Sequence, residues 1–287
     1  MRKISPQNPS PVPQGILVII GGHEDKGQGE DSAKEQANPP EILASFVKLI
    51  EKDDPVIEVI STASSEGDES FEDYRKAFEK LNIKQVNHIH HDSRKDVIKE
   101  ELEDRIGKAD AFFFTGGDQL KLTSIYGGTN FLTHLKERYI SERIVIAGTS
   151  AGAMAFSTPM IYAGTGEKQQ ITGEIKITTG LEFLKDVCID THFIDRSRFI
   201  RMAQVIATNP TTIGVGIEEN TAIIVRNGVN AEVIGQSLVT IIEGFSITNS
   251  NITDFNDSNK IGIQDMTVHL LPESSVYEIP QTNPAHK

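Results

Sequence analysis

The chain has 287 residues, of which 38% are hydrophobic, so it can bury the core of one large domain or two small ones. Its formal net charge of −13 argues against nucleic acid or an anionic membrane as a partner, because phosphate groups are bound by clustered Lys and Arg. Cys188 is the only cysteine, which excludes an internal disulfide and a cysteine-based structural zinc site.

The N-terminal segment, residues 1–14, is rich in proline and asparagine, and we predict a flexible tail there. It has no apolar core of a signal peptide, and the sequence contains no apolar run of about 18 residues. We therefore expect a cytoplasmic protein. Residues 15–280 are expected to form a single α/β domain, followed by a short tail over residues 281–287.

Apolar runs of strand length alternate with segments of helical periodicity in the first half of the chain. The strand-like runs are at residues 15–20, 56–61, 85–90, 111–115 and 143–147. Helical spacing marks residues 39–52 and 69–82, and the charged, glycine-containing residues 23–40 are predicted to be a long loop. This alternation predicts an α/β fold with a mainly parallel sheet and helices on both faces.

The pattern changes from about Gly214 onward, where β-branched residues dominate. A turn signal at Arg226-Asn227-Gly228 separates two apolar runs. We predict extra antiparallel or edge strands in the same domain toward the C-terminus.

The segment around Ser150 is the first candidate for chemistry. It places Ser150 between Gly148 and Gly152, after a buried strand and before helix-compatible residues. This is the form of a nucleophile elbow, a strained turn that projects the serine hydroxyl above a sheet. The alternative is a glycine-rich turn with an incidental serine, because this short pattern is common by chance.

A second glycine turn, in the sequence FFFTGGDQ, also follows a buried strand. Gly116 and Gly117 let backbone N–H groups approach a substrate closely. We predict that the N–H groups of Gly117 and Ala151 form an oxyanion hole. The segment lacks the lysine and hydroxyl spacing of a P-loop, and the chain has no GxGxxG motif at a strand end.

His192 stands at the end of an apolar strand, beside Asp190 and before Arg196, Arg198 and Arg201. Basic side chains at the start of a helix interact unfavourably with the helix dipole, which suggests that they are there to bind an anion. The arginines are therefore predicted to bind a carboxylate or phosphate group. The alternative is an exposed charged turn.

The other histidines are weaker candidates. His23 follows the first strand and is a candidate to line a site. His88 and His90 share one strand face, but no carboxylate or cysteine completes a metal site, so we predict a solvated strand end and no metal. The prediction of a solvated strand end includes the neighbouring His91, and the remaining ones are expected to be surface or packing residues: His134, His269 and His286.

Four motifs in this order, FTGGDQ, AGTSAGA, DTHF with its arginines, and GIEENTA, resemble those of the cyanophycinases of the S51 serine peptidase family. The resemblance runs from about residue 15 to residue 279. It implies a flavodoxin-like or class I glutamine amidotransferase-like fold, and a relation to aspartyl dipeptidases.

The resemblance also assigns roles. It implies that Ser150 is the nucleophile, that His192 is the general base, and that an acidic residue of GIEENTA completes a catalytic triad. Glu219 matches the acid position, and the adjacent Glu218 is the alternative. No metal or organic cofactor is implied.

Cyanophycin is a poly-aspartate with an arginine on each β-carboxylate, and the resemblance implies release of β-Asp-Arg dipeptides. The substrate-binding residues would be Gln119, Asp190, Thr191, Arg196, Arg198 and Arg201. Thr191 departs from the DQHF motif of the family, which leaves other peptides containing aspartate or β-linkages as alternative substrates. A non-catalytic peptide-binding module on the same fold is a second alternative. A homodimer is also expected from the resemblance.

Overall fold

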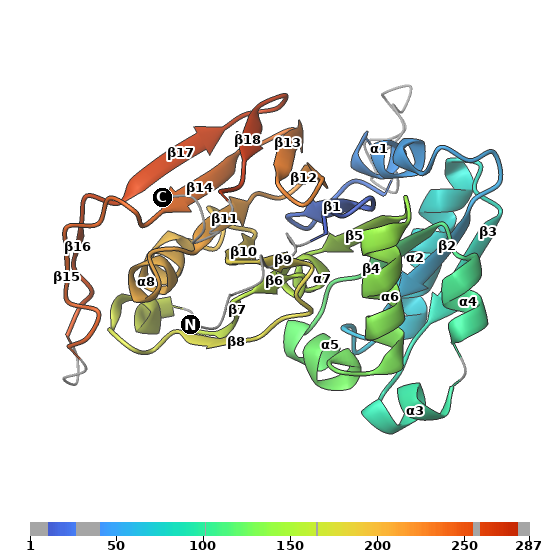
Figure 1. Cartoon of the computed structure of the whole chain (residues 1–287), viewed down its shortest axis with the longest axis horizontal. Coiled ribbons are helices and arrows are strands. Elements are labelled where there is room, and N and C mark those ends of the chain that lie inside the picture. The colour runs from blue at the N-terminus through green and yellow to red at the C-terminus, as the bar shows by residue number, and fades with distance from the viewer. Residues whose placement is uncertain (1–10, 27–40, 101, 165, 255–258, 281–287) are drawn as a thin grey trace, which may run out of the picture.

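A computed structural model describes residues 11–26, 41–100, 102–164, 166–254 and 259–280 (Figure 1). Most of the tail predicted over residues 1–14, most of the loop predicted over residues 23–40, and the tail over residues 281–287 lie outside the described residues. In the part of the chain that is described, no helix combines the length and apolar character needed to cross a membrane.

Eight strands form the main sheet, in the order β18-β13-β12-β1-β5-β4-β2-β3. Their bounds are β1 Ile16–Ile20, β2 Val56–Ile60, β3 Gln85–Ile89, β4 Ala111–Phe114, β5 Val145–Thr149, β12 Thr221–Arg226, β13 Asn230–Gly235 and β18 Val276–Glu278. The five predicted strands are β1 to β5, and they pair in parallel. β5 ends two residues later than predicted, because it stays paired with β1 as far as Thr149 opposite Ile20.

Helices cover both faces of this sheet, as predicted (Figure 1). Phe46 of α1 and Phe78 of α2 pack with Phe113 on one face, while Tyr126 of α5 and Leu135 of α6 pack on the other. All five of these side chains are buried. Burial of each such side chain contributes about 1.5–3 kcal/mol to folding stability. The packing on both faces therefore makes the sheet a stable support for the loops at its edge. The helices on the main sheet are α1 Glu41–Ile50, α2 Gly67–Lys80, α3 Arg94–Lys99, α4 Glu103–Lys108, α5 Gln119–Tyr126, α6 Asn130–Ser141 and α7 Ala151–Met154.

The C-terminal half builds a second sheet of six strands, in the order β17-β14-β11-β10-β6-β9. Its strands are β6 Ser157–Thr158, β9 Leu184–Lys185, β10 Val187–Thr191, β11 Ile213–Ile217, β14 Val239–Glu243 and β17 Thr267–Leu271. Ile189 and Val215 belong to the same hydrophobic cluster as Leu17 of the main sheet. The other face is covered by α8, Phe199–Thr208, which packs against Cys188 and Ile242.

The predicted hairpin at Asn227-Gly228 is confirmed and joins β12 to β13. The expectation of antiparallel strands from about Gly214 onward is confirmed, because β11 pairs antiparallel with β14. β11 is fully buried and also pairs in parallel with β10. Four short strands and one 3-10 helix complete the description: β7 Met160–Ala163, β8 Lys176–Thr178, β15 Asn249–Ser250, β16 Ile263–Gln264 and η2 Gly166–Gln170.

Candidate active site

Ser150 occupies a strained turn between β5 and α7. Its φ of 49° and ψ of −114° lie in a region that side chains other than glycine rarely adopt. A Cβ atom on Gly152 would lie 2.4 Å from the carbonyl oxygen of Phe114, and one on Gly148 would lie 2.7 Å from the backbone of Gly152. The two glycines therefore allow the tight passage from strand to helix that a nucleophile elbow requires.

His192 follows the last residue of β10 and points toward Ser150. Its Nε2 atom lies 3.0 Å from the Ser150 hydroxyl oxygen. The backbone of His192 also has a positive φ, 47°. A Cβ atom on Gly22 would lie 2.5 Å from the imidazole ring, so only glycine leaves room for the ring in this position.

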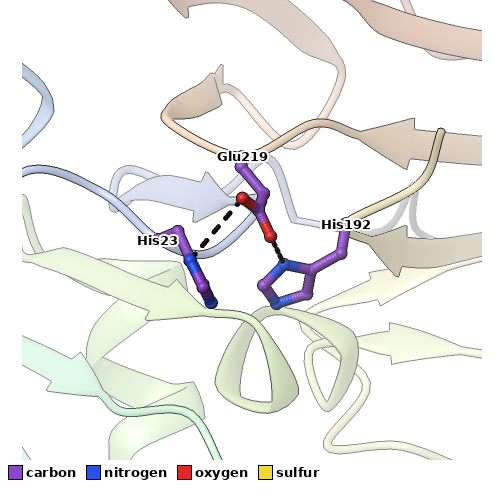
Figure 2. A group of neighbouring side chains, drawn as sticks. All are labelled: His23, His192 and Glu219. Atoms are coloured by element: carbon purple, nitrogen blue, oxygen red, sulfur yellow. Dashed lines mark hydrogen bonds and ion pairs between the residues drawn. The ribbon is translucent and has the colours of Figure 1, made fainter. Parts of the chain in front are cut away.

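Glu219 lies in the link between β11 and β12, on the other side of the imidazole (Figure 2). Its Oε1 atom is 2.5 Å from Nδ1 of His192. Glu218 points elsewhere, and its carboxylate accepts a hydrogen bond from the backbone N–H of Ile194. Of the two acids that the sequence left open, Glu219 is therefore the one that contacts His192.

The segment after β1 holds these three residues through its backbone. Three successive carbonyl groups, those of Ile20, Gly21 and Gly22, accept hydrogen bonds from the backbone N–H groups of Ser150, His192 and Asn220. The distances are 3.1, 3.0 and 2.9 Å. Since Asn220 adjoins Glu219, one short segment fixes the backbone at or beside all three side chains.

The electrostatics favour a neutral imidazole beside an ionised carboxylate. Burial lowers the pKa of His192 below its usual value, and the hydrogen bond that His192 donates to Glu219 opposes that effect. The hydrogen bond with His192 lowers the pKa of Glu219. A neutral imidazole with its Nδ1–H directed at a carboxylate can accept a proton at Nε2, which is the arrangement of a general base.

A pocket of about 720 Å³ opens over the Ser150 hydroxyl. It is lined by His23, Glu24, Asp25, Lys26, Ser70, Asp73, Tyr74, Gly116, Gly117, Thr149, Ser150, His192 and Arg196. The presence of Gly116 and Gly117 places the second glycine turn beside Ser150, as an oxyanion site would need. The lining of the pocket carries acidic and basic side chains together.

Sequence reasoning missed Glu24, the most deeply buried carboxylate in this lining, with a relative exposure of 5%. Its carboxylate accepts hydrogen bonds from the hydroxyl groups of Tyr74 and Thr149. Burial, and then the charge of Glu24, raise the pKa of Tyr74 well above its usual value, so the phenol keeps its proton. The signal was present in the sequence, because Glu24 comes just after the first strand, where ligands bind in open α/β sheets.

The structure places Asp190, Arg198 and Arg201, which were predicted to bind the substrate, outside the lining of this pocket. Asp190 is fully buried, and its carboxylate accepts hydrogen bonds from Arg201 at 2.6 and 2.5 Å and from Arg198 at 2.8 Å. Arg198 and Arg201 do bind an anion, as predicted for these arginines, but that anion is the carboxylate of Asp190. Arg201 is itself buried, and none of the three residues lines the pocket.

Of the other predicted substrate residues, only Arg196 lines the pocket. Thr191 is fully buried in β10 and lies outside the pocket lining. The Gln119 side chain donates a hydrogen bond to the carbonyl of Ile161 and lies outside the pocket lining.

The histidines predicted to be marginal divide into two groups. His23 lines the pocket, with Nδ1 3.5 Å from Oε2 of Glu219. His88 and His90 contact the hydroxyl of Ser61, at 2.7 and 2.9 Å, and are not in the pocket lining. Among the described residues, one group has metal-ligand spacing, and it consists of His23, His192 and Glu219.

Known proteins are similar to this chain over most of its length. The family model for peptidase family S51 matches residues 28–233. A cyanophycinase from Synechococcus elongatus is 29% identical over 274 residues, covering 96% of this chain and 82% of the relative. A cyanophycinase from Geminocystis herdmanii is 26% identical over 261 residues, covering 91% and 92% of the two chains. The crystal structure of a peptidase from an acI-B1 Actinobacterium has the same fold, with a TM-score of 0.64, 20% identity, and coverage of 92% and 96%.

Proposed function

Because the chain belongs to peptidase family S51, it is a serine peptidase, and we propose that it hydrolyses cyanophycin to β-Asp-Arg dipeptides with a triad of Ser150, His192 and Glu219. The observation that carries the proposal is the continuous chain of contacts from the Ser150 hydroxyl through both ring nitrogens of His192 to Glu219. The similarity to cyanophycinases over nearly the whole chain supports the choice of substrate.

The reaction is an acyl transfer. The Ser150 oxygen attacks the backbone amide carbonyl of the polymer while His192 Nε2 accepts the hydroxyl proton. The imidazolium then gives this proton to the leaving amine, and the C–N bond breaks. Water, activated by His192 in the same way, hydrolyses the acyl-enzyme. Glu219 holds the imidazole in the tautomer with the proton on Nδ1 and stabilises the cation that forms.

The tetrahedral intermediate carries a negative oxygen that needs hydrogen-bond donors. We assign the backbone N–H groups of Gly117 and Ala151 to this role, because Gly117 lines the pocket and Ala151 directly follows Ser150 at the start of α7. The first N–H groups of a helix have no partner within the helix. Each such donor contributes about 3–4 kcal/mol to transition-state stabilisation.

The mixed charge of the pocket suits a substrate with both signs. Glu24 is a buried carboxylate that can bind the guanidinium group of the substrate arginine, and Arg196 can bind a backbone carboxylate of the polymer. Both residues replace the buried Asp190 cluster as candidates for substrate recognition. The arginine of cyanophycin would add a charged partner to the hydroxyl groups of Tyr74 and Thr149 that already bond to Glu24, and an Asp-containing peptide without arginine lacks this partner.

The test is incubation of the purified protein with insoluble cyanophycin, followed by clearing of the suspension and mass spectrometry of the products, with Ser150→Ala alongside. Release of β-Asp-Arg by the unmodified protein alone is the expected result. If no dipeptide appears although a serine-directed acylating reagent labels Ser150, the substrate assignment is wrong and the assignment of the nucleophile stands.

A further inference from the structure

A second histidine shares the carboxylate of Glu219. His23 lies on the side of Glu219 away from the Nδ1 contact of His192, and dashed lines in Figure 2 join both rings to the same carboxylate. The two imidazole rings are edge to face, with centroids 5.1 Å apart. The proton path from Ser150 through His192 does not use His23, so the mechanism leaves this convergence of two imidazoles and one carboxylate unexplained.

We propose that His23, His192 and Glu219 form a binding site for Zn²⁺, and that an ion bound there reversibly inhibits the peptidase. Two imidazole nitrogens and one carboxylate oxygen are a ligand set that zinc adopts in proteins, with water in the fourth position. Imidazole ligands also favour zinc over Mg²⁺ and Ca²⁺, which prefer oxygen. The site concerns regulation of the peptidase and does not depend on cyanophycin being the substrate.

The distances are close to those that zinc needs. One ligand atom from each residue lies within 4.8 Å of the others. Two atoms bound to one tetrahedral zinc at about 2.0–2.1 Å are roughly 3.3–3.4 Å apart, so the ligand atoms must move closer by up to about 1.5 Å. His23 can supply this movement, because its side chain is 68% exposed and free to turn inward. Glu219 is also partly exposed, at 32%.

The charges around the site pull in both directions. Glu24, Asp25 and Asp73 line the same pocket and attract a divalent cation, while Lys26 and Arg196 oppose it. Carboxylates outnumber cations in this lining even before Glu219 is counted, which favours a cation that also satisfies two imidazoles.

Inhibition follows from where the ion binds. Zinc coordinates a ring nitrogen through its lone pair, so binding at Nδ1 of His192 requires the ring hydrogen to be on Nε2 and breaks the contact of Nδ1–H with Glu219. Nε2 then has no lone pair with which to accept the Ser150 proton. Nothing covalent changes, and removing the ion restores the enzyme.

The first experiment is a titration of peptidase activity with zinc chloride after treatment with a chelator, for the unmodified protein, His23→Asn and His134→Asn. Asparagine is the replacement because His23 has a φ of 47°, a conformation that asparagine tolerates. His134 is a partly exposed histidine of α6 outside the pocket lining and serves as the matched control. Each rate is normalised to that variant's own metal-free rate.

The expected result is inhibition of the unmodified protein that a chelator reverses, with the inhibitory midpoint raised at least tenfold in His23→Asn and unchanged in His134→Asn. An unchanged midpoint in His23→Asn would mean that zinc acts elsewhere, and would overturn the proposal.

The second experiment is calorimetric titration of Ser150→Ala with zinc chloride and with magnesium chloride, which requires no turnover. We expect one bound zinc per chain, no binding of magnesium, and at least tenfold weaker zinc binding when His23→Asn is added. Absence of zinc binding overturns this proposal whatever the substrate is. Zinc binding by a protein that leaves cyanophycin intact contradicts only the substrate proposed above.

Discussion

Arg201 binds both carboxylate oxygens of the fully buried Asp190, two residues before His192 in the chain. Removing one partner of a buried ion pair costs about 3–5 kcal/mol when the remaining charge is uncompensated. Arg198 still bonds to Asp190 when Arg201 is removed, so we predict that Arg201→Met lowers the free energy of unfolding by no more than this amount in urea denaturation. Arg196→Gln is the matched control, because Arg196 is exposed, and it should change stability by less than about 0.5 kcal/mol. Equal stabilities of the two variants would contradict a structural role for Arg201.

The backbone strain at Ser150 makes a second prediction. Ser150→Ala and Ser150→Gly should both lose activity by a factor on the order of 10⁵–10⁶, because the nucleophile is absent. Glycine adopts the observed φ and ψ without strain, whereas alanine does not. We therefore expect Ser150→Gly to unfold at a higher urea concentration than Ser150→Ala, by about 1 kcal/mol in free energy. The opposite order would show that the turn relaxes when the hydroxyl is removed.

Glu218 and Glu219 are adjacent acids with different contacts, and glutamine replacement separates them. Glu219→Gln should reduce kcat by roughly 10³–10⁴-fold, because an amide no longer stabilises the imidazolium or the tautomer that His192 needs. Glu218→Gln should reduce kcat less than tenfold, since Glu218 bonds to the backbone N–H of Ile194. Steady-state kinetics on a soluble cyanophycin fragment checks both. A larger loss in Glu218→Gln would reassign the acid.

Glu24 is predicted to select substrates with a guanidinium group. A hydrogen bond to a charged group contributes about 1.5–3 kcal/mol, so Glu24→Gln should lower kcat/KM for the arginine substrate roughly tenfold to 150-fold. The matched substrate carries citrulline, the neutral isostere of arginine. The unmodified enzyme should discriminate strongly against citrulline and Glu24→Gln only weakly. Discrimination that survives the substitution would place the arginine pocket elsewhere.

The pH dependence of kcat/KM should follow His192. The neutral imidazole is the active form, and burial lowers the pKa of His192 below its usual value of 6.5. Activity is therefore retained as pH falls through 6.5 and is lost only at the lower pH where His192 becomes protonated. A profile of kcat/KM between pH 4.5 and 8 checks this prediction. An acid limb centred above pH 6.5 would contradict it.

Much of the fold was predictable because buried parallel strands appear as continuous apolar runs. β1 to β5 were all found in this way, and so was the β12–β13 hairpin, since Asn227 and Gly228 suit its turn. The second sheet was not predicted as a separate layer. The sequences of β10 and β11 are apolar on both faces. Their pattern therefore does not show that α8 packs on one face of these strands and the main sheet on the other.

The site was partly predictable for a related reason. Ser150 and His192 follow strand ends, where the chain leaves the sheet and side chains become available to ligands. Whether the other predicted polar residues can contact a substrate depends on how deeply they are buried, and the spacing of residues in the sequence does not predict burial. From their positions in the sequence, Asp190 and Arg201 are candidates to bind a substrate. In the structure they form a buried ion pair with each other. The homodimer, the cytoplasmic location and the boundaries of the domain remain predictions.

The three carbonyl groups after β1 also set the order in which activity can arise. Ile20, Gly21 and Gly22 are made early in synthesis, but they receive Ser150, His192 and Asn220 from segments made much later. The residues of the proposed triad can therefore meet only after the chain has been made as far as Asn220. The site depends on contacts between the first strand and segments far along the chain, so it forms with the whole fold and not within one local segment.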